Sequence, residues 1–170
     1  MLQRLIPVLI AVACFASCQP VVNIGPVISK HQDFDSYWNQ GKAEITTYDL
    51  YQARYGEMRQ GEAVMVFVTE NFSQEKQVKT DNPNAYATPI IPVLKMNMTK
   101  RFYTGLYPYS MMLSSFVAAG GMAPWQALKI ASSVSEWCGQ VYAQLNLHDD
   151  HYRYNLHSYF ESEGDIDKHL

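Results

Sequence analysis

The residues of this sequence that could perform chemistry are few and scattered. Cys138 stands in the stretch Glu-Trp-Cys-Gly, a context typical of a β-strand, where a cysteine is either a nucleophile or a small buried residue. His148, Asp149, Asp150 and His151 place four possible metal ligands side by side. Neighbouring residues at a tight turn splay apart, however, and Asp-Asp is common in turns. We therefore interpret Cys138 as a buried packing residue and predict no metal site.

The acidic stretch 161–167 offers oxygen ligands of the kind that calcium prefers, but it lacks the Asp-x-Asp-x-Asp-Gly pattern of a calcium loop. We predict a solvated tail that frays from Glu161 to Leu170. The sequence contains no Gly-x-Ser-x-Gly, no His-Glu-x-x-His and no phosphate-binding glycine loop. No catalytic residue and no cofactor is predicted. A hydrolase that uses Cys138 or a histidine (His148, His151 or His157) remains an alternative.

The N-terminus predicts export and lipidation. One basic residue, Arg4, precedes an apolar run from Leu5 to Phe15 that is too short to span a bilayer but suits a secretory signal peptide. The following Ala-Ser-Cys18 resembles the lipobox of bacterial lipoproteins. The resemblance implies a signal peptide over residues 1–17 and acyl chains such as palmitate on Cys18, and two or more chains anchor a protein stably. Gln19, in place of Asp, points to the outer membrane.

Composition narrows the class of protein. The chain has 170 residues, 48% hydrophobic and 17% charged, which predicts a folded domain with a real core. The net charge of −3 and the absence of a basic stripe argue against nucleic acid as a partner. Twelve tyrosines fit a β-protein, because their rings suit a pleated, half-solvated surface.

Residues 18–32 contain proline and glycine and are expected to form a tether before a single β-rich domain over residues 33–170. Aromatic residues spaced three and four apart predict a short helix from Asp33 to Gly41. A tyrosine-rich strand over 43–55 and a strand over 63–68 follow, joined by a turn from Gly56 to Gly61. The second strand is apolar on both faces and should lie inside a sheet.

Five further strands are predicted after a long polar loop from Ser73 to Pro92. They cover residues 93–103, 109–117, 127–137, 141–147 and 152–160. Short turns between successive strands indicate antiparallel pairing. The predicted fold is therefore mainly all-β, an antiparallel meander of about seven long strands that forms an incomplete barrel, with one short N-terminal helix.

Aromatic and methionine side chains are the candidates for ligand binding, because both types form adaptable apolar surfaces. In the strand over 93–103, Met96 and Met98 share a face with Leu94 and Phe102, and Lys100 is the charged exception on that face. The candidate ligand-binding residues are Trp38, Tyr48, Tyr51, Met96 and Met98. Filling the core is the alternative role, and it is the favoured one for Trp38 and the methionines.

Several longer stretches carry a resemblance to a family of uncharacterised bacterial lipoproteins, whose members often bear a septum-formation-inhibitor (Maf) label. The stretches are Tyr37–Glu44, Gln52–Glu57, Val68–Glu70, Gln77–Lys79, Tyr103–Ser110, Glu136–Gln140 and His157–Asp165. The Ser-x-Ser-Pro-Arg-Arg motif of true Maf nucleotide pyrophosphatases has no counterpart here, so no catalytic residue is carried over. The family's longer chains imply that this one is shortened at its C-terminus, with Tyr152–Phe160 as an exposed edge.

Together these patterns predict a lipid-anchored protein of the cell envelope, at the outer membrane, that acts as a non-catalytic binding or assembly module. Its partners would be the membrane, through the lipid anchor on Cys18, and a hydrophobic or amphipathic ligand. Pairing with another protein through the C-terminal edge strand is a further alternative.

Overall fold

A computed structural model describes residues 31–82, 84, 90–120 and 124–170. The chain divides into two units, Met1–His31 and Gln32–Leu170, and the fold below is that of the second unit. The predicted signal peptide, Cys18 and most of the predicted tether lie outside the described residues. Within the described part of the chain, no helix combines the length and the apolar character that crossing a membrane requires.

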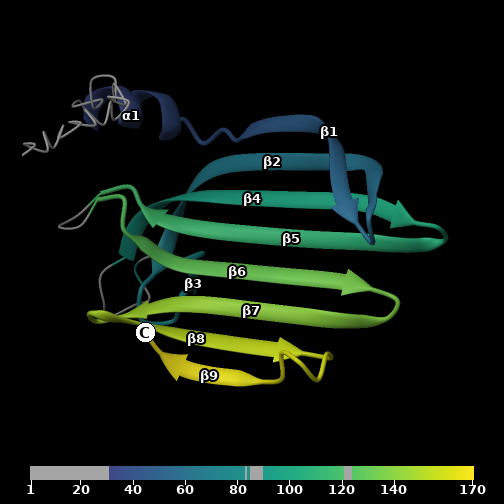
Figure 1. The fold of residues 1–170 in the computed structure, drawn as a ribbon. Coiled ribbons are helices and arrows are strands. Elements are labelled where there is room, and N and C mark those ends of the chain that lie inside the picture. The colour runs from purple at the N-terminus through teal and green to yellow at the C-terminus, as the bar shows by residue number, and fades with distance from the viewer. Residues whose placement is uncertain (1–30, 83, 85–89, 121–123) are drawn as a thin grey trace, which may run out of the picture. The chain divides into compact units, whose positions relative to one another are not determined.

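The described residues form one helix and nine strands (Figure 1). The helix is α1 (His31–Trp38). The strands are β1 (Glu44–Arg54), β2 (Glu57–Ser73), β3 (Val78–Lys79), β4 (Ile90–Thr104), β5 (Tyr107–Ala118), β6 (Ala127–Glu136), β7 (Gly139–His148), β8 (His151–Ser158) and β9 (Ile166–His169).

All nine strands belong to one antiparallel sheet in the order β1-β2-β4-β5-β6-β7-β8-β9, and β3 pairs with β2. Strands β1 and β9 lie at opposite ends of this order, so the described sheet is not closed (Figure 1). The prediction of an all-β meander that forms an incomplete barrel is confirmed. The two strands beyond the predicted seven are the short β3 and β9, which carry too few residues for a recognisable alternation.

The predicted turn from Gly56 to Gly61 is wrong, because the first hairpin turns within two residues. Tyr55 and Gly56 both have positive φ angles, 54° and 75°, as the tight turns of hairpins require. Gly61 lies inside β2, opposite Leu50 on β1 and Phe102 on β4. A Cβ there would overlap the Arg101 carbonyl oxygen, so this glycine serves the close approach of two strands.

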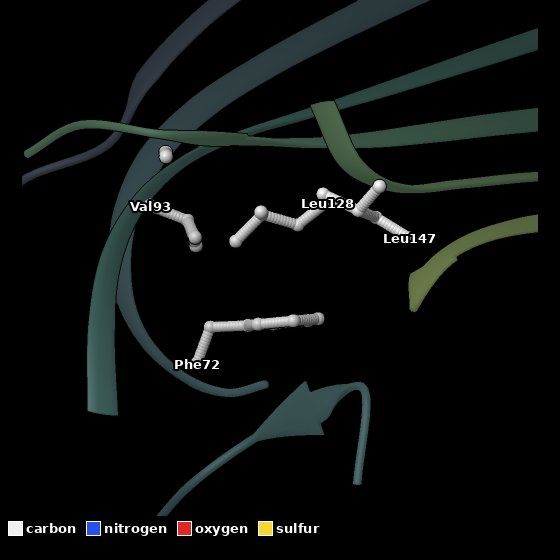
Figure 2. Packing of buried hydrophobic residues seen from close by; sticks show 5 residues of the cluster. Phe72, Val93, Leu128 and Leu147 are labelled. Carbon is white, nitrogen blue, oxygen red and sulfur yellow. The ribbon is translucent and has the colours of Figure 1, made fainter. Parts of the chain in front are cut away.

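The buried core lies at one end of the sheet. Phe72 and Val93 are fully buried, at the end of β2 and the start of β4. They cluster with Ala118, Leu128 and Leu147, which come from the corresponding ends of β5, β6 and β7. Figure 2 shows these apolar side chains gathered beside the curved end of a strand. The core therefore joins five strands at the end of the sheet where β2 ends and the chain continues to β3.

The connection between β2 and β4 is tied to this core. The predicted long loop from Ser73 to Pro92 instead includes β3, and β4 begins already at Ile90. Gln77 is buried, and its Nε2 donates to the Leu147 carbonyl oxygen over 3.1 Å. Lys129 Nζ donates to the Gln77 carbonyl oxygen over 2.8 Å. These two bonds link the connection to β6 and β7. Because their partners lie 52 and 70 positions apart, local sequence patterns do not predict them.

The C-terminal segment is ordered by pairing, and the prediction of a frayed tail is wrong. Strand β9 pairs with β8 from Arg153–His169 to Leu156–Ile166. The Arg153 guanidinium binds the Asp167 carboxylate at 2.7 Å. Strand β8 is therefore covered along this stretch, and the C-terminal edge of the sheet is β9 rather than the predicted Tyr152–Phe160.

Candidate binding surface

The strand register gives the sheet two chemically different faces. Residues directly opposite each other in antiparallel strands point to the same side, and successive residues alternate. We call one side the methionine face. Three adjacent rows of it cross the sheet from β2 to β8. They are Ala63-Lys100-Met111-Val134-Val141-Ser158, Met65-Met98-Leu113-Ser132-Ala143-Leu156 and Phe67-Met96-Ser115-Ile130-Leu145-Tyr154.

Most of the side chains in these rows are half-buried, with only Ala63 and Leu156 fully buried. The rows cross six strands, and five interstrand spacings of about 4.8 Å make a surface about 24 Å wide. The opposite face is more polar at the same level of the sheet. There Lys95 binds Glu70 at 3.4 Å, and the Ser114 hydroxyl donates to Asn97 over 2.7 Å. An apolar surface of this breadth that remains half-exposed is typical of a binding site.

Helix α1 lies at one end of the methionine face. The Trp38 ring packs against Phe67 with 6.2 Å between the ring centroids, and the Trp38 carbonyl oxygen accepts a 2.8 Å hydrogen bond from the Thr69 hydroxyl. Phe34, one turn earlier, meets Trp125 edge to face at 5.0 Å. The aromatic spacing that predicted the helix thus holds it against β2 and the β5–β6 connection. The helix spans His31–Trp38 rather than the predicted Asp33 to Gly41, and Gly41, with a φ of +68°, lies in the turn that follows it.

The tip of the β1–β2 hairpin contacts the other end of the same face. The hydroxyls of Tyr55 and Tyr109 lie 2.8 Å apart, and the Arg54 guanidinium lies over the Tyr109 ring at 5.2 Å. Burial, together with the hydrogen bond that it shares with Tyr55, raises the pKa of Tyr109. Tyr109 in turn stacks on Phe102 at 4.9 Å. The apolar rows are therefore bounded by aromatic clusters at both ends of the strands.

A hollow of about 180 Å³ opens on the methionine face between β4, β5 and β6. Met98, Met111, Leu113 and Val134 form most of its apolar wall, together with Met112 and Ser132. Lys100 is the charged residue in this wall. Its side chain is half-buried, and no hydrogen bond or ion pair connects it to the described residues.

The structure brings together four of the five predicted ligand-binding residues. Met96 and Met98 lie in adjacent rows of the methionine face, Tyr48 continues the first row on β1, and Trp38 packs on Phe67 at its end. Tyr51 is opposite Gln60 and points to the other face. It lies three residues from Tyr48, an odd separation that reverses the direction of the side chain in a strand.

The alternation within its own strand places Lys100 on the face of Met98, but no alternation pattern in the sequence aligns Met65 of β2 or Met111 of β5 with these two residues. The alternation of side chains within each strand could be predicted from the sequence, but the register between neighbouring strands could not. The register of a hairpin depends on the position of its turn. The turn between β1 and β2 lies at Tyr55 and Gly56 and does not extend to Gly61, so the predicted turn implied the wrong register. The short turn at Gly105, between β4 and β5, was the available signal for placing Met111 opposite Lys100.

The possible catalytic residues lie apart. Cys138 is exposed in the β6–β7 turn, so the interpretation as a buried residue is wrong. The Glu136 carboxylate, which accepts a hydrogen bond from the Cys138 amide, raises the pKa of the thiol. His148 and His151 flank the turn at the other end of β7, about 30 Å away along a ten-residue strand.

The third histidine, His157, belongs to a different hollow of about 450 Å³ at the ends of β6, β7 and β8. Its imidazole lies 3.5 Å from the exposed Asp165 carboxylate. The described residues thus contain no adjacent cysteine and histidine of the kind that activates a thiol nucleophile.

Searches against protein-family models, curated proteins and solved structures find no match to this chain. The fold and the candidate surface define an all-β protein with an unclosed antiparallel sheet and one broad apolar face.

Proposed function

We propose that this protein is a lipid-anchored protein of the cell envelope, held at the outer membrane through Cys18, and that it binds an apolar or amphipathic molecule on the methionine face without transforming it. The observation that carries the proposal is the set of half-exposed apolar rows across β2 to β8. Covering such a surface releases ordered water and stabilises a complex by about 25 cal/mol per Å² of apolar area. Methionine side chains adapt to varied apolar partners.

The chemistry of the surface favours binding over catalysis. Apart from Lys100, its three rows contain aliphatic, methionine, aromatic and serine side chains. Adaptable apolar contacts select for hydrophobic bulk and tolerate variation in the ligand's shape. A carrier or scaffold for membrane-derived molecules would need these properties.

Native mass spectrometry of the protein purified gently from membranes tests the ligand part of the proposal. We expect an adduct that organic extraction removes and that the extract restores. A protein that is purified in this way and carries no adduct, and that binds no lipid added back, would overturn it. Incorporation of labelled palmitate tests the anchor separately, since Cys18→Ser should abolish the label and Cys138→Ser should keep it.

Pairing through the C-terminal edge is a second candidate, because β9 leaves one side of the sheet without a strand partner among the described residues. Size measurement of the protein with and without residues after Asp165, a truncation that removes β9 and leaves β8 in place, separates the two candidates. Loss of an oligomer on truncation would favour pairing.

The third candidate is an envelope hydrolase that uses Cys138 or a histidine. A hydrolase panel applied to single variants of Cys138, His148, His151 and His157 tests it. An activity that disappears with one of them would favour this candidate over binding alone.

A further inference from the structure

Lys100 differs from the other lysines of the main sheet in its surroundings. Lys95 pairs with Glu70, and Lys129 donates to the Gln77 carbonyl oxygen. Lys168 lies over the Tyr154 ring at the edge of the sheet. Lys100 instead lines the hollow on the methionine face, directly opposite Met111 on β5 and Ala63 on β2. Its side chain forms no ion pair and no hydrogen bond with another described residue.

An unpaired ammonium group among apolar side chains is unfavourable unless water or an anion satisfies it. A lysine at a surface can extend its head into water, yet its four-carbon stem still fixes the charge beside the apolar wall. Lys100 is the charged residue of the three rows, and its neighbours on both adjacent strands, Ala63 and Met111, are apolar. The hollow is therefore complementary to a molecule with one anionic group and one apolar part.

We propose that Lys100 binds the anionic head group of a single-chain amphiphile whose hydrocarbon tail lies on the methionine face. The inference rests on the proposed function and adds the class of ligand to it. A carboxylate or phosphate oxygen accepts a charge-assisted hydrogen bond from Lys100 Nζ, and the tail covers Met98, Met111 and neighbouring side chains. The rows extend across the strands for about 24 Å and provide the length that an extended tail needs.

The geometry also gives the ligand a direction. Lys100 lies in the row closest to the hairpin tip at Tyr55, whereas α1 lies beyond the row that contains Phe67. The head group is thus held near β4 and β5, and the tail crosses the strands towards β8 over the rows of Met98 and Met96.

Three probes with the same tail test this inference: hexadecanoate, hexadecyl phosphate and hexadecanol, each titrated below its aggregation concentration into the full protein after delipidation. We expect both anions to bind at least about tenfold more tightly than the alcohol. Lys100→Gln should remove this preference by weakening the binding of both anions to about the level of the alcohol, and Lys100→Arg should preserve it. Arg101→Gln is the matched control, because Arg101 is the exposed next residue on the opposite face.

Each result separates the head-group assignment from the proposed function. The role of Lys100 is overturned if all three probes bind equally, or if the Lys100→Gln protein still prefers the anions. Either result remains compatible with an apolar binding site on the methionine face. Failure of every probe to bind overturns both. A preference for only one of the two anions retains Lys100 and identifies the head group as carboxylate or phosphate.

Discussion

Gly61→Ala is the substitution that most directly tests the arrangement of β2 against β4. Gly61 lies opposite Phe102, and a Cβ at this position would lie 2.7 Å from the Phe102 Cβ, which is 0.7 Å inside the 3.4 Å at which ordinary contact begins. It would also overlap the Arg101 carbonyl oxygen. Both obstacles belong to the backbone or its first side-chain atom, so rotation of a side chain cannot relieve them.

The magnitude follows from two opposing terms. Overpacking a tight site costs typically 1–3 kcal/mol, and we expect about 3 kcal/mol here because β4 itself must move. Replacing a glycine inside a strand by alanine gains about 0.5–1 kcal/mol in conformational entropy. The net loss is about 2 kcal/mol, which lowers the melting temperature of a domain of this size by about 8 °C.

Gly139→Ala is the matched control for this substitution. A Cβ at Gly139 would also clash, at 2.6 Å, with the ring of Tyr159, which is 74% exposed and can rotate, whereas the Tyr159 Cβ at 3.0 Å requires a small shift of the exposed chain. We expect a change in stability of less than about 1 kcal/mol. Thermal and urea unfolding of both variants provide the comparison. A Gly61→Ala protein as stable as the wild type, or an equal loss in the two variants, would refute the close approach of β2 and β4.

Two further predictions concern the core and the C-terminal edge. Phe72→Ala removes a fully buried ring and should lower the free energy of unfolding in urea by about 3–5 kcal/mol. Tyr51→Ala, at a position 64% exposed, should lower it by less than about 1 kcal/mol. Similar losses in the two variants would contradict the position of the core. The hydrogen bond from Arg153 lowers the pKa of Asp167 below 3.8, so this ion pair holds β9 above that pH and is lost as the pH falls through the lowered pKa. Hydrogen-exchange protection of β9 should therefore decrease below about pH 3.8 in the wild type. The Asp167→Asn variant should show weaker protection of β9 already at neutral pH. Unchanged protection in this variant would contradict the role of the ion pair.

Much of the fold was predictable because local patterns determine strands. The alternation in residues 93–103 located β4, and the aromatic spacing of Phe34 and Trp38 located α1. Strand β6, at Ala127–Glu136, was likewise predicted within one residue of its bounds. The Gly61 error shows the limit of such patterns. A glycine needed for positive φ and a glycine needed for a close contact between strands are identical in sequence.

The surface was harder to predict than the strands, since it depends on contacts between residues distant in the chain. Met98 was singled out from its own strand, but its neighbours Met65, Leu113 and Ser132 come from three other strands and share its row only through the register. Tyr51 was grouped with Tyr48 by composition, although the alternation of side chains separates them. Strand β9 is held by an ion pair between Arg153 and Asp167, which no local sequence pattern predicts.

Replacing Met98 by a carboxylate tests the central claim, that the methionine face binds an apolar or amphipathic ligand, most directly. Native mass spectra of the protein isolated from membranes would be recorded for the wild type, for Met98→Glu in the hollow and for Met58→Glu, whose side chain is 63% exposed on the opposite face. We predict a bound molecule in the wild type and in Met58→Glu, and its loss in Met98→Glu. A wild-type protein that binds no amphiphile, or a Met98→Glu protein that retains the bound molecule, would contradict the claim.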